Sequence, residues 1–111
     1  MSTTLVNCTP HAINIKTENG TVSVPASGNV ARVETTVVPV SELDNGVQIV
    51  KTVFNTDKVT GLPEPKEGTF YIVSLITLQA LEGIRNDLFA PGNLIRDKEG
   101  NIVGCDGLTV A

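Results

Sequence analysis

The stretch TFYIVSLITLQALEG, residues 69–83, decides the fold, because it joins a buried strand directly to a helix. Residues 69–74 form a nearly continuous apolar run, which predicts a central strand buried on both faces. After it, leucines recur at helical spacing, with Ser74 placed to cap the helix and Gly83 placed to end it. The sequence therefore predicts one short helix, at about residues 75–83.

The segments on either side of this stretch contain turn-forming residues. Residues 55–68, NTDKVTGLPEPKEG, are expected to form a loop, since two prolines hold the chain extended there. Residues 85–93, RNDLFAPGN, are expected to form a second loop. Beyond it, the segments 94–97 and 102–105 flank the turn sequence KEGN and predict a hairpin.

The N-terminal half shows strand-like alternation interrupted by Asn-Gly pairs, which favour tight hairpin turns. The paired segments are expected to be 12–16 with 21–25 through Asn19-Gly20, and 30–40 with 47–54 through Asn45-Gly46. A further short strand is expected at residues 4–8. The pattern predicts an α+β fold in one β-dominated domain, residues 1–111, with several antiparallel hairpins and one short helix.

The composition limits the possible partners. The chain has 8 basic and 12 acidic residues, for a net charge of −4, and this balance excludes the basic stripe that duplex nucleic acid requires. With three Phe, one Tyr and no Trp, the core must be aliphatic. A chain this small with open strand edges is expected to form a homo-oligomer.

The two cysteines, Cys8 and Cys105, are not spaced as a zinc site. They could pair, but we interpret them as reduced, buried thiols of a cytoplasmic protein. The opening MSTTLVN has no basic segment or apolar run, so no signal peptide is expected. No apolar run is long enough to cross a membrane, and neither a membrane partner, a metal nor a cofactor is expected.

All three arginines and the single histidine lie beside turns or at the ends of elements: Arg32, Arg85, Arg96 and His11. The planar guanidinium group suits phosphate and carboxylate, so this placement predicts a small anion-binding site. The sequence contains none of the GxSxG, Walker, GxGxxG or HExxH motifs, and we therefore expect binding without catalysis.

Each candidate has a structural alternative. In NCTPHAINI, residues 7–15, His11 either forms part of a pocket wall or bonds a backbone carbonyl at a structural corner. Arg32, in SGNVARV, either binds a ligand or pairs with a neighbouring acid on the strand. Arg85 with Asp87, and Arg96 with Asp97, are either local salt bridges or arginines oriented to hold phosphate.

The sequence resembles a family of small phage and prophage proteins. The resemblance rests on NCTPHAINI, SGNVARV, VTGLPEPKEGTFYIVS, RNDLFAPG and RDKEGNIVGCDGL, which together span nearly the whole chain. Phage proteins of this size and β-rich build are similar to the anti-defence sponges, oligomers that trap nucleotide signals of Thoeris or CBASS immunity without cleaving them. This second likeness is one of context and carries over no binding residue.

The function expected from these observations is sequestration of a small anionic nucleotide signal by a phage-encoded, oligomeric binding protein in the host cytoplasm. Arg85 and Arg96 would hold phosphates, and Tyr71 or Phe89 would stack on a base. The complete set of expected ligand-binding residues is Asn7, Thr9, His11, Arg32, Tyr71, Arg85, Asp87, Phe89, Arg96 and Asp97. The alternatives are a phage structural, accessory or host-protein-binding factor and a cyclic-nucleotide hydrolase that uses His11 with an acid.

Overall fold

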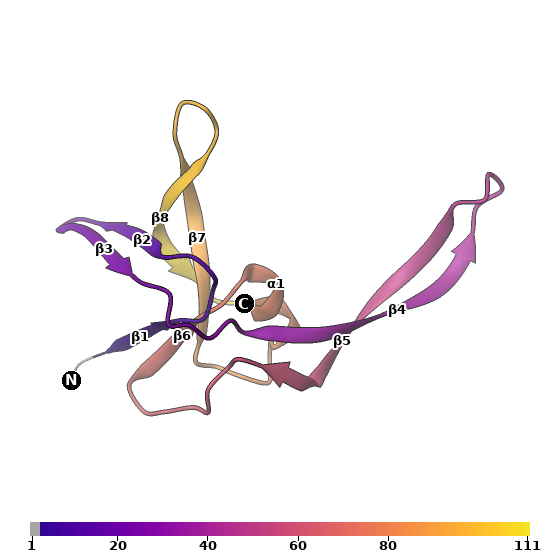
Figure 1. Cartoon of the computed structure of the whole chain (residues 1–111), viewed down its shortest axis with the longest axis horizontal. Coiled ribbons are helices and arrows are strands. Elements are labelled where there is room, and N and C mark those ends of the chain that lie inside the picture. Colours follow the sequence, from indigo (N-terminus) through magenta and orange to yellow (C-terminus); the bar gives the residue numbers. More distant parts are fainter. Residues whose placement is uncertain (1–2) are drawn as a thin grey trace.

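The computed structural model describes residues 3–111 and shows a curled sheet from which one long hairpin projects (Figure 1). Met1 and Ser2 lie outside the described residues. They begin the segment MSTTLVN, in which no signal peptide is expected. We call the curled sheet and its helix the body, and the hairpin the arm. The body comprises β1 (Thr4–Asn7), β2 (Ile13–Thr17), β3 (Gly20–Val24), β6 (Thr69–Ile72), α1 (Leu75–Ala80), β7 (Leu88–Arg96) and β8 (Ile102–Thr109). The arm comprises β4 (Arg32–Glu42) and β5 (Gln48–Thr60).

The body sheet is mixed and has the strand order β1-β6-β7-β8-β2-β3. Strands β1, β6 and β7 run parallel, whereas β7–β8 and β2–β3 are antiparallel hairpins. The two hairpins are joined by parallel pairing of β2 with β8 at Ile15 and Cys105. The sheet curls until its edges meet, because Asn7 of β1 is bridged to Ala26, just after β3.

Strand β6 is central to the core, as the apolar run in the sequence predicts. Tyr71, with Val73 just after the strand, belongs to a cluster that includes Leu78 of α1 and Leu81 just after the helix. Ile72, which alternates with them, is fully buried in a second cluster formed mainly by β2, β3 and β8. Burial of both faces of one short strand explains why this stretch contains almost no polar side chains.

The helix α1 is shorter than expected. Ser74 caps it as predicted, because its hydroxyl accepts a hydrogen bond from the Thr77 amide. The helix ends at Ala80, since Leu81 already departs from helical geometry at φ −100° and ψ 12°. The expected end at Gly83 marks instead the turn that follows, where φ is +79°. Leu81 remains buried, so the apolar spacing was correct although the helix does not extend through it.

The arm consists of two strands that pair only with each other. It accounts for the elongated shape in Figure 1, whose principal extents are 56 × 39 × 23 Å. The radius of gyration is 16.9 Å. A compact chain of this length would have a radius of about 13 Å, so the arm lies largely outside the packed volume.

Three further features of the fold differ from the sequence expectation. Residues 55–60, expected in a loop, continue strand β5, and the expected loop 85–93 contains the start of strand β7. Strand β7 is recruited by pairing with β6 and β8, which overrides the loop-like Pro91 and Gly92. The fold is β-dominated with one short helix, at 55% strand and 6% helix. Its sheet nevertheless contains parallel pairs as well as the expected antiparallel hairpins.

Candidate functional site

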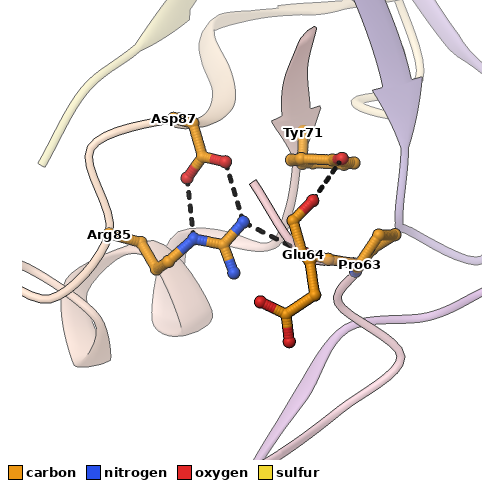
Figure 2. A network of polar contacts seen from close by, with 5 residues as sticks. All are labelled: Pro63, Glu64, Tyr71, Arg85 and Asp87. Atoms are coloured by element: carbon orange, nitrogen blue, oxygen red, sulfur yellow. Dashed lines mark hydrogen bonds and ion pairs between the residues drawn. The ribbon is translucent and has the colours of Figure 1, made fainter. Parts of the chain in front are cut away.

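Arg85 and Asp87 form a bidentate ion pair at the edge of the body (Figure 2). The Arg85 Nε donates to Asp87 Oδ1 at 2.8 Å, and Nη2 donates to Oδ2 at 2.7 Å. Nη2 also donates to the Pro63 carbonyl at 3.1 Å. The side chains are only 18% and 12% exposed, so this pair is screened far less than a surface pair. These contacts match the local salt-bridge alternative.

The electrostatics of the pair follow from its hydrogen bonds. The bonds from Arg85 are the main reason that the pKa of Asp87 lies below its usual value, although partial burial opposes them. The same bonds raise the pKa of Arg85. The guanidinium also lies 5.8 Å from the centre of the Tyr71 ring, and the Tyr71 hydroxyl donates to the Glu64 carbonyl at 3.0 Å. The network ties the chain at Pro63 and Glu64 to β6 and to the segment after α1.

Arg96 and Asp97 stabilise the β7–β8 turn separately. The Arg96 Nη1 donates to the Gly100 carbonyl at 2.9 Å. The Asp97 Oδ1 accepts from the amides of Glu99 and Asn101 at 2.9 and 3.0 Å. No ion pair between the two side chains is found within residues 3–111. The expected pairing of each arginine with its nearby aspartate therefore holds for Arg85 and is wrong for Arg96.

The N-terminal phrase forms a corner built around the buried Asn7. The Asn7 Nδ2 donates to the carbonyls of His11 and Val24 at 2.8 and 3.0 Å. The Asn7 Oδ1 accepts from the Thr9 amide at 2.9 Å and from the Thr9 hydroxyl at 2.6 Å. Asn7 therefore stabilises this corner. His11 takes part through its backbone carbonyl, and the imidazole side chain of His11 lies at the surface.

The two aromatic rings expected to stack on a base, Tyr71 and Phe89, make contacts within the protein. Tyr71 is 3% exposed, so the expectation that a base stacks on its ring is wrong in this structure. Phe89 is half-buried and stacks on Phe70, with ring centroids 5.0 Å apart and planes 24° apart. One face of the Phe89 ring is therefore used within the protein.

Arg32 lies beside a pocket of about 270 Å³ where the arm leaves the body. Thr9, Pro10, Ser74 and Thr77 also line this pocket, which we call the Arg32 pocket. Arg32 is exposed, and within the described part of the chain no carboxylate or carbonyl bonds its guanidinium. Within residues 3–111, Arg32 is the arginine that uses none of its donors in the fold, whereas Arg96 uses one and Arg85 is held by Asp87 and Pro63.

The polar groups of the Arg32 pocket are supplied by the helix cap and the N-terminal corner. The Ser74 hydroxyl donates to Thr77 Oγ1 at 2.9 Å, so the Thr77 hydroxyl hydrogen is not used in that bond. Cys8 lies at the pocket base, and burial is the main reason that its pKa is raised. This thiol stays protonated at neutral pH and is a poor nucleophile. The pocket therefore offers donors without an activated nucleophile.

Two larger surface hollows suit an anion less well. A groove of about 370 Å³ between β2 and the β7–β8 hairpin is lined by His11 and mostly apolar side chains, including Leu94 and Ile102. A wider hollow of about 410 Å³ contains Lys66, but Glu67 and Asp87 line it as well. Carboxylates beside a ligand phosphate repel it, so Lys66 does not make this hollow an anion site.

The structure distributes the expected site residues over several places rather than one. Thr9 and Arg32 share the Arg32 pocket, with Asn7 supporting its wall, whereas His11 lies in the neighbouring groove. The remaining residues lie in the ion-pair network, the aromatic stack or the β7–β8 turn: Tyr71, Arg85, Asp87, Phe89, Arg96 and Asp97.

Sequence reasoning missed Ser74 and Thr77 as lining residues. Ser74 was recognised as a helix cap, and a cap hydroxyl lies by definition at an element end, where pockets form. The sequence could not show that this cap lies close to Thr9, Pro10 and Arg32 in the fold.

Within residues 3–111, no group of three or more His, Cys, Asp or Glu side chains is arranged to hold a metal ion. No helix of this part of the chain has the length and apolar character needed to cross a membrane. Cys8 and Cys105 are free and buried, in different clusters of the core. Comparison of the chain with protein-family models, curated proteins and solved structures finds no match.

Proposed function

We propose that this chain is a binding protein that sequesters a small anionic, nucleotide-derived signal without cleaving it, and that Arg32 holds the phosphate. The observation that carries the proposal is the unpaired Arg32 guanidinium beside the Arg32 pocket. Arg85 and Arg96, the arginines expected to bind phosphate, use hydrogen bonds to stabilise the fold. The phosphate-binding role therefore moves to Arg32.

The chemistry of the pocket fits one phosphate group and its attached sugar. A guanidinium can donate two parallel hydrogen bonds to one phosphate. The Thr77 hydroxyl can donate a third bond, and Thr9 can present its oxygen to a ribose hydroxyl. The pocket volume of about 270 Å³ lies near the lower limit of small-molecule sites, so a larger ligand would extend beyond it.

The resemblance to phage and prophage proteins provides the biological setting of this proposal. A phage protein in the host cytoplasm would lower the free concentration of an immune signal by binding it stoichiometrically. Such a role requires affinity and abundance, and it needs no activated nucleophile or general base. The protonated Cys8 thiol beside the pocket is consistent with that requirement.

A protein-binding or structural role is the second candidate function, and the arm is the observation that favours it. The arm carries exposed apolar side chains on both strands, and such patches mark interaction surfaces. The two candidates are compatible, since the arm and the Arg32 pocket are separate surfaces that meet only where β4 begins.

Calorimetric titration with a panel of cyclic nucleotides and cyclic ADP-ribose isomers tests the first candidate. Arg32→Ala should weaken binding about 10- to 150-fold, equivalent to about 1.5–3 kcal/mol for lost charge-assisted hydrogen bonds. Arg32→Lys should also lose affinity, because a point charge cannot reproduce the bidentate fork. Arg96→Ala is the matched control, since Arg96 is exposed at the distant turn and should leave affinity unchanged.

Heating the complex distinguishes the remaining alternatives. A sequestering protein should release intact ligand, whereas a hydrolase should release cleaved product. Failure of the wild-type protein to bind any member of the panel would remove support for these ligands and favour the protein-binding function. Equal affinity of wild type and Arg32→Ala would show that the Arg32 pocket is not the site.

A further inference from the structure

The arm exposes more apolar surface than a free surface hairpin normally carries. Its exposed apolar residues are 38–62% accessible: Val37, Val38, Val40, Leu43, Val47, Ile49, Val50, Val53 and Phe54. With roughly 150 Å² for each whole residue, they present on the order of 600 Å². These side chains lie on both faces of the hairpin and at its tip, so no single face carries all of this surface.

One face of the arm is free of charge over three successive cross-strand pairs. The register opposes Thr35 to Phe54, Val37 to Thr52, and Pro39 to Val50. Alternate residues of a strand point to the same face, so these six side chains share one face. A two-stranded hairpin is marginally stable alone in water, and this one has no third strand within residues 3–111.

The two outer edges of the arm differ. Strand β4 contains Pro39, which lacks an amide hydrogen and interrupts any ladder on that strand. Strand β5, Gln48–Thr60, contains no proline along its 13 residues, and within the described chain it pairs only with β4. The β5 edge is therefore the side of the arm that another strand can extend.

We propose that a second copy of this chain covers the arm, through antiparallel pairing of β5 with β5 of the partner. Antiparallel pairing of a strand with its own copy satisfies a two-fold axis, so one open edge is sufficient for both subunits. Pairing at this edge satisfies the open backbone groups of β5 and brings its exposed apolar side chains beside those of the partner strand. The result is a four-stranded ribbon in the order β4-β5-β5-β4.

The charge pattern of β5 restricts the register of this pairing. Lys51 is the only charged residue between Val50 and Asn55, the part of β5 that pairs with β4 without a register shift. A register that places Lys51 opposite Lys51 of the partner is destabilised by like charges. The two-fold axis therefore does not pass through Lys51. This proposal is independent of ligand binding, because no residue from Thr35 to Asn55 lines the Arg32 pocket.

Analytical ultracentrifugation with matched charge substitutions tests the proposal. The wild-type protein should sediment at twice the chain mass of 11.7 kDa at micromolar concentration. Val50→Glu should raise the dissociation constant at least 100-fold. Val103→Glu, on the β7–β8 hairpin, should leave it unchanged although Val103 is 51% exposed and Val50 is 48% exposed. A monomeric wild type, or an equally stable Val50→Glu dimer, overturns the proposal.

Cross-linking distinguishes pairing through β5 from other uses of the arm. Thr52→Cys on β5 should give a covalent dimer with a short bis-maleimide, whereas Thr35→Cys on β4 should give much less. Both positions are exposed, and the native Cys8 and Cys105 are buried, which keeps their background reaction low. Equal cross-linking at the two positions, or none at Thr52→Cys, contradicts pairing through β5. Circular dichroism checks that both variants are folded. If Thr52→Cys is unfolded, Lys51→Cys, which also lies on β5, replaces it; if Thr35→Cys is unfolded, Thr36→Cys on β4 replaces it.

Discussion

The arm and the body are built from similar strands but are stabilised differently. In the body, β6 buries both faces, and the strand contacts α1 on one side and the β2–β3–β8 cluster on the other. The arm has longer strands, yet each residue of these strands is exposed or only partly buried. Strand length and β-branched composition thus predict pairing, whereas stability depends on what covers the faces.

Matched isoleucine truncations should separate the two regions most clearly. Ile72→Ala, at a fully buried position, should cost about 4 kcal/mol of unfolding free energy through lost burial and a residual cavity. Ile49→Ala, at a position 38% exposed, should cost less than about 0.5 kcal/mol in a Val50→Glu background where the arm is expected to be free. Urea denaturation measures both, and comparable losses would contradict the division into a packed body and an unsupported arm.

Matched glycine substitutions should separate the base of the arm from its tip. Gly61 has φ +75°, and a Cβ there would overlap the Val30 carbonyl, so Gly61→Ala should cost about 3 kcal/mol. Gly46, at the tip, has φ +89° but open space around it, so Gly46→Ala should cost only about 1 kcal/mol. Melting curves at one protein concentration test this order. A larger loss at Gly46 would show that the junction is looser than its geometry indicates.

The Arg85–Asp87 pair should contribute a pH-dependent part of the body's stability. The folded-state pKa of Asp87 is lowered, so its contribution is complete above the ordinary aspartate pKa of about 3.9 and is lost as pH falls through the folded value. Asp87→Asn should cost about 2 kcal/mol near pH 7, less than a fully buried pair because both side chains are partly exposed. Urea unfolding at neutral and acidic pH should show this difference shrinking on acidification. A difference independent of pH would exclude an ionic contribution.

Removal of the Tyr71 hydroxyl should have the smallest effect. Tyr71→Phe deletes one hydrogen bond to the Glu64 carbonyl while leaving the ring packed, so the loss should be about 1 kcal/mol. The guanidinium of Arg85 would keep its contact with the aromatic face. Urea denaturation should show an unchanged denaturant slope, because the folded surface is preserved. If Tyr71→Phe lowers the free energy of unfolding as much as Asp87→Asn does, the Tyr71 hydrogen bond contributes as much stability as the Arg85–Asp87 pair.

Local features of the fold were predictable because they depend on neighbouring residues. The turns at Asn19-Gly20 and Asn45-Gly46 join the expected hairpins, and Ser74 caps the helix. The parallel pairing of β1 with β6 was not predicted, since it joins Thr4 to Thr69 and leaves no periodic signal in either segment. For the same reason, residues 85–93 were interpreted as a loop although Leu88 and Ala90 are buried strand residues.

The sequence predicts which types of residue could bind a phosphate, but it does not show which of these residues lie together in one pocket. The arginines could be named because few side chains suit phosphate, yet the sequence could not show which of them were used within the fold. Arg85 lies two residues from Asp87, and only the structure shows that the pair is bidentate and also bonds the Pro63 carbonyl. Arg32 is separated from Ser74 by some forty positions, so their common pocket depends on tertiary packing.

The long separation between β1 and β6 also has a kinetic consequence. The arm joins residues close in sequence, and such hairpins form in about 1–10 μs, whereas nonlocal pairing slows folding by orders of magnitude. During synthesis at about 5–20 residues per second, β1 waits several seconds for β6 to emerge. Both strands of the arm leave the ribosome before β6 does, so the local hairpin can form before the nonlocal strands of the body meet.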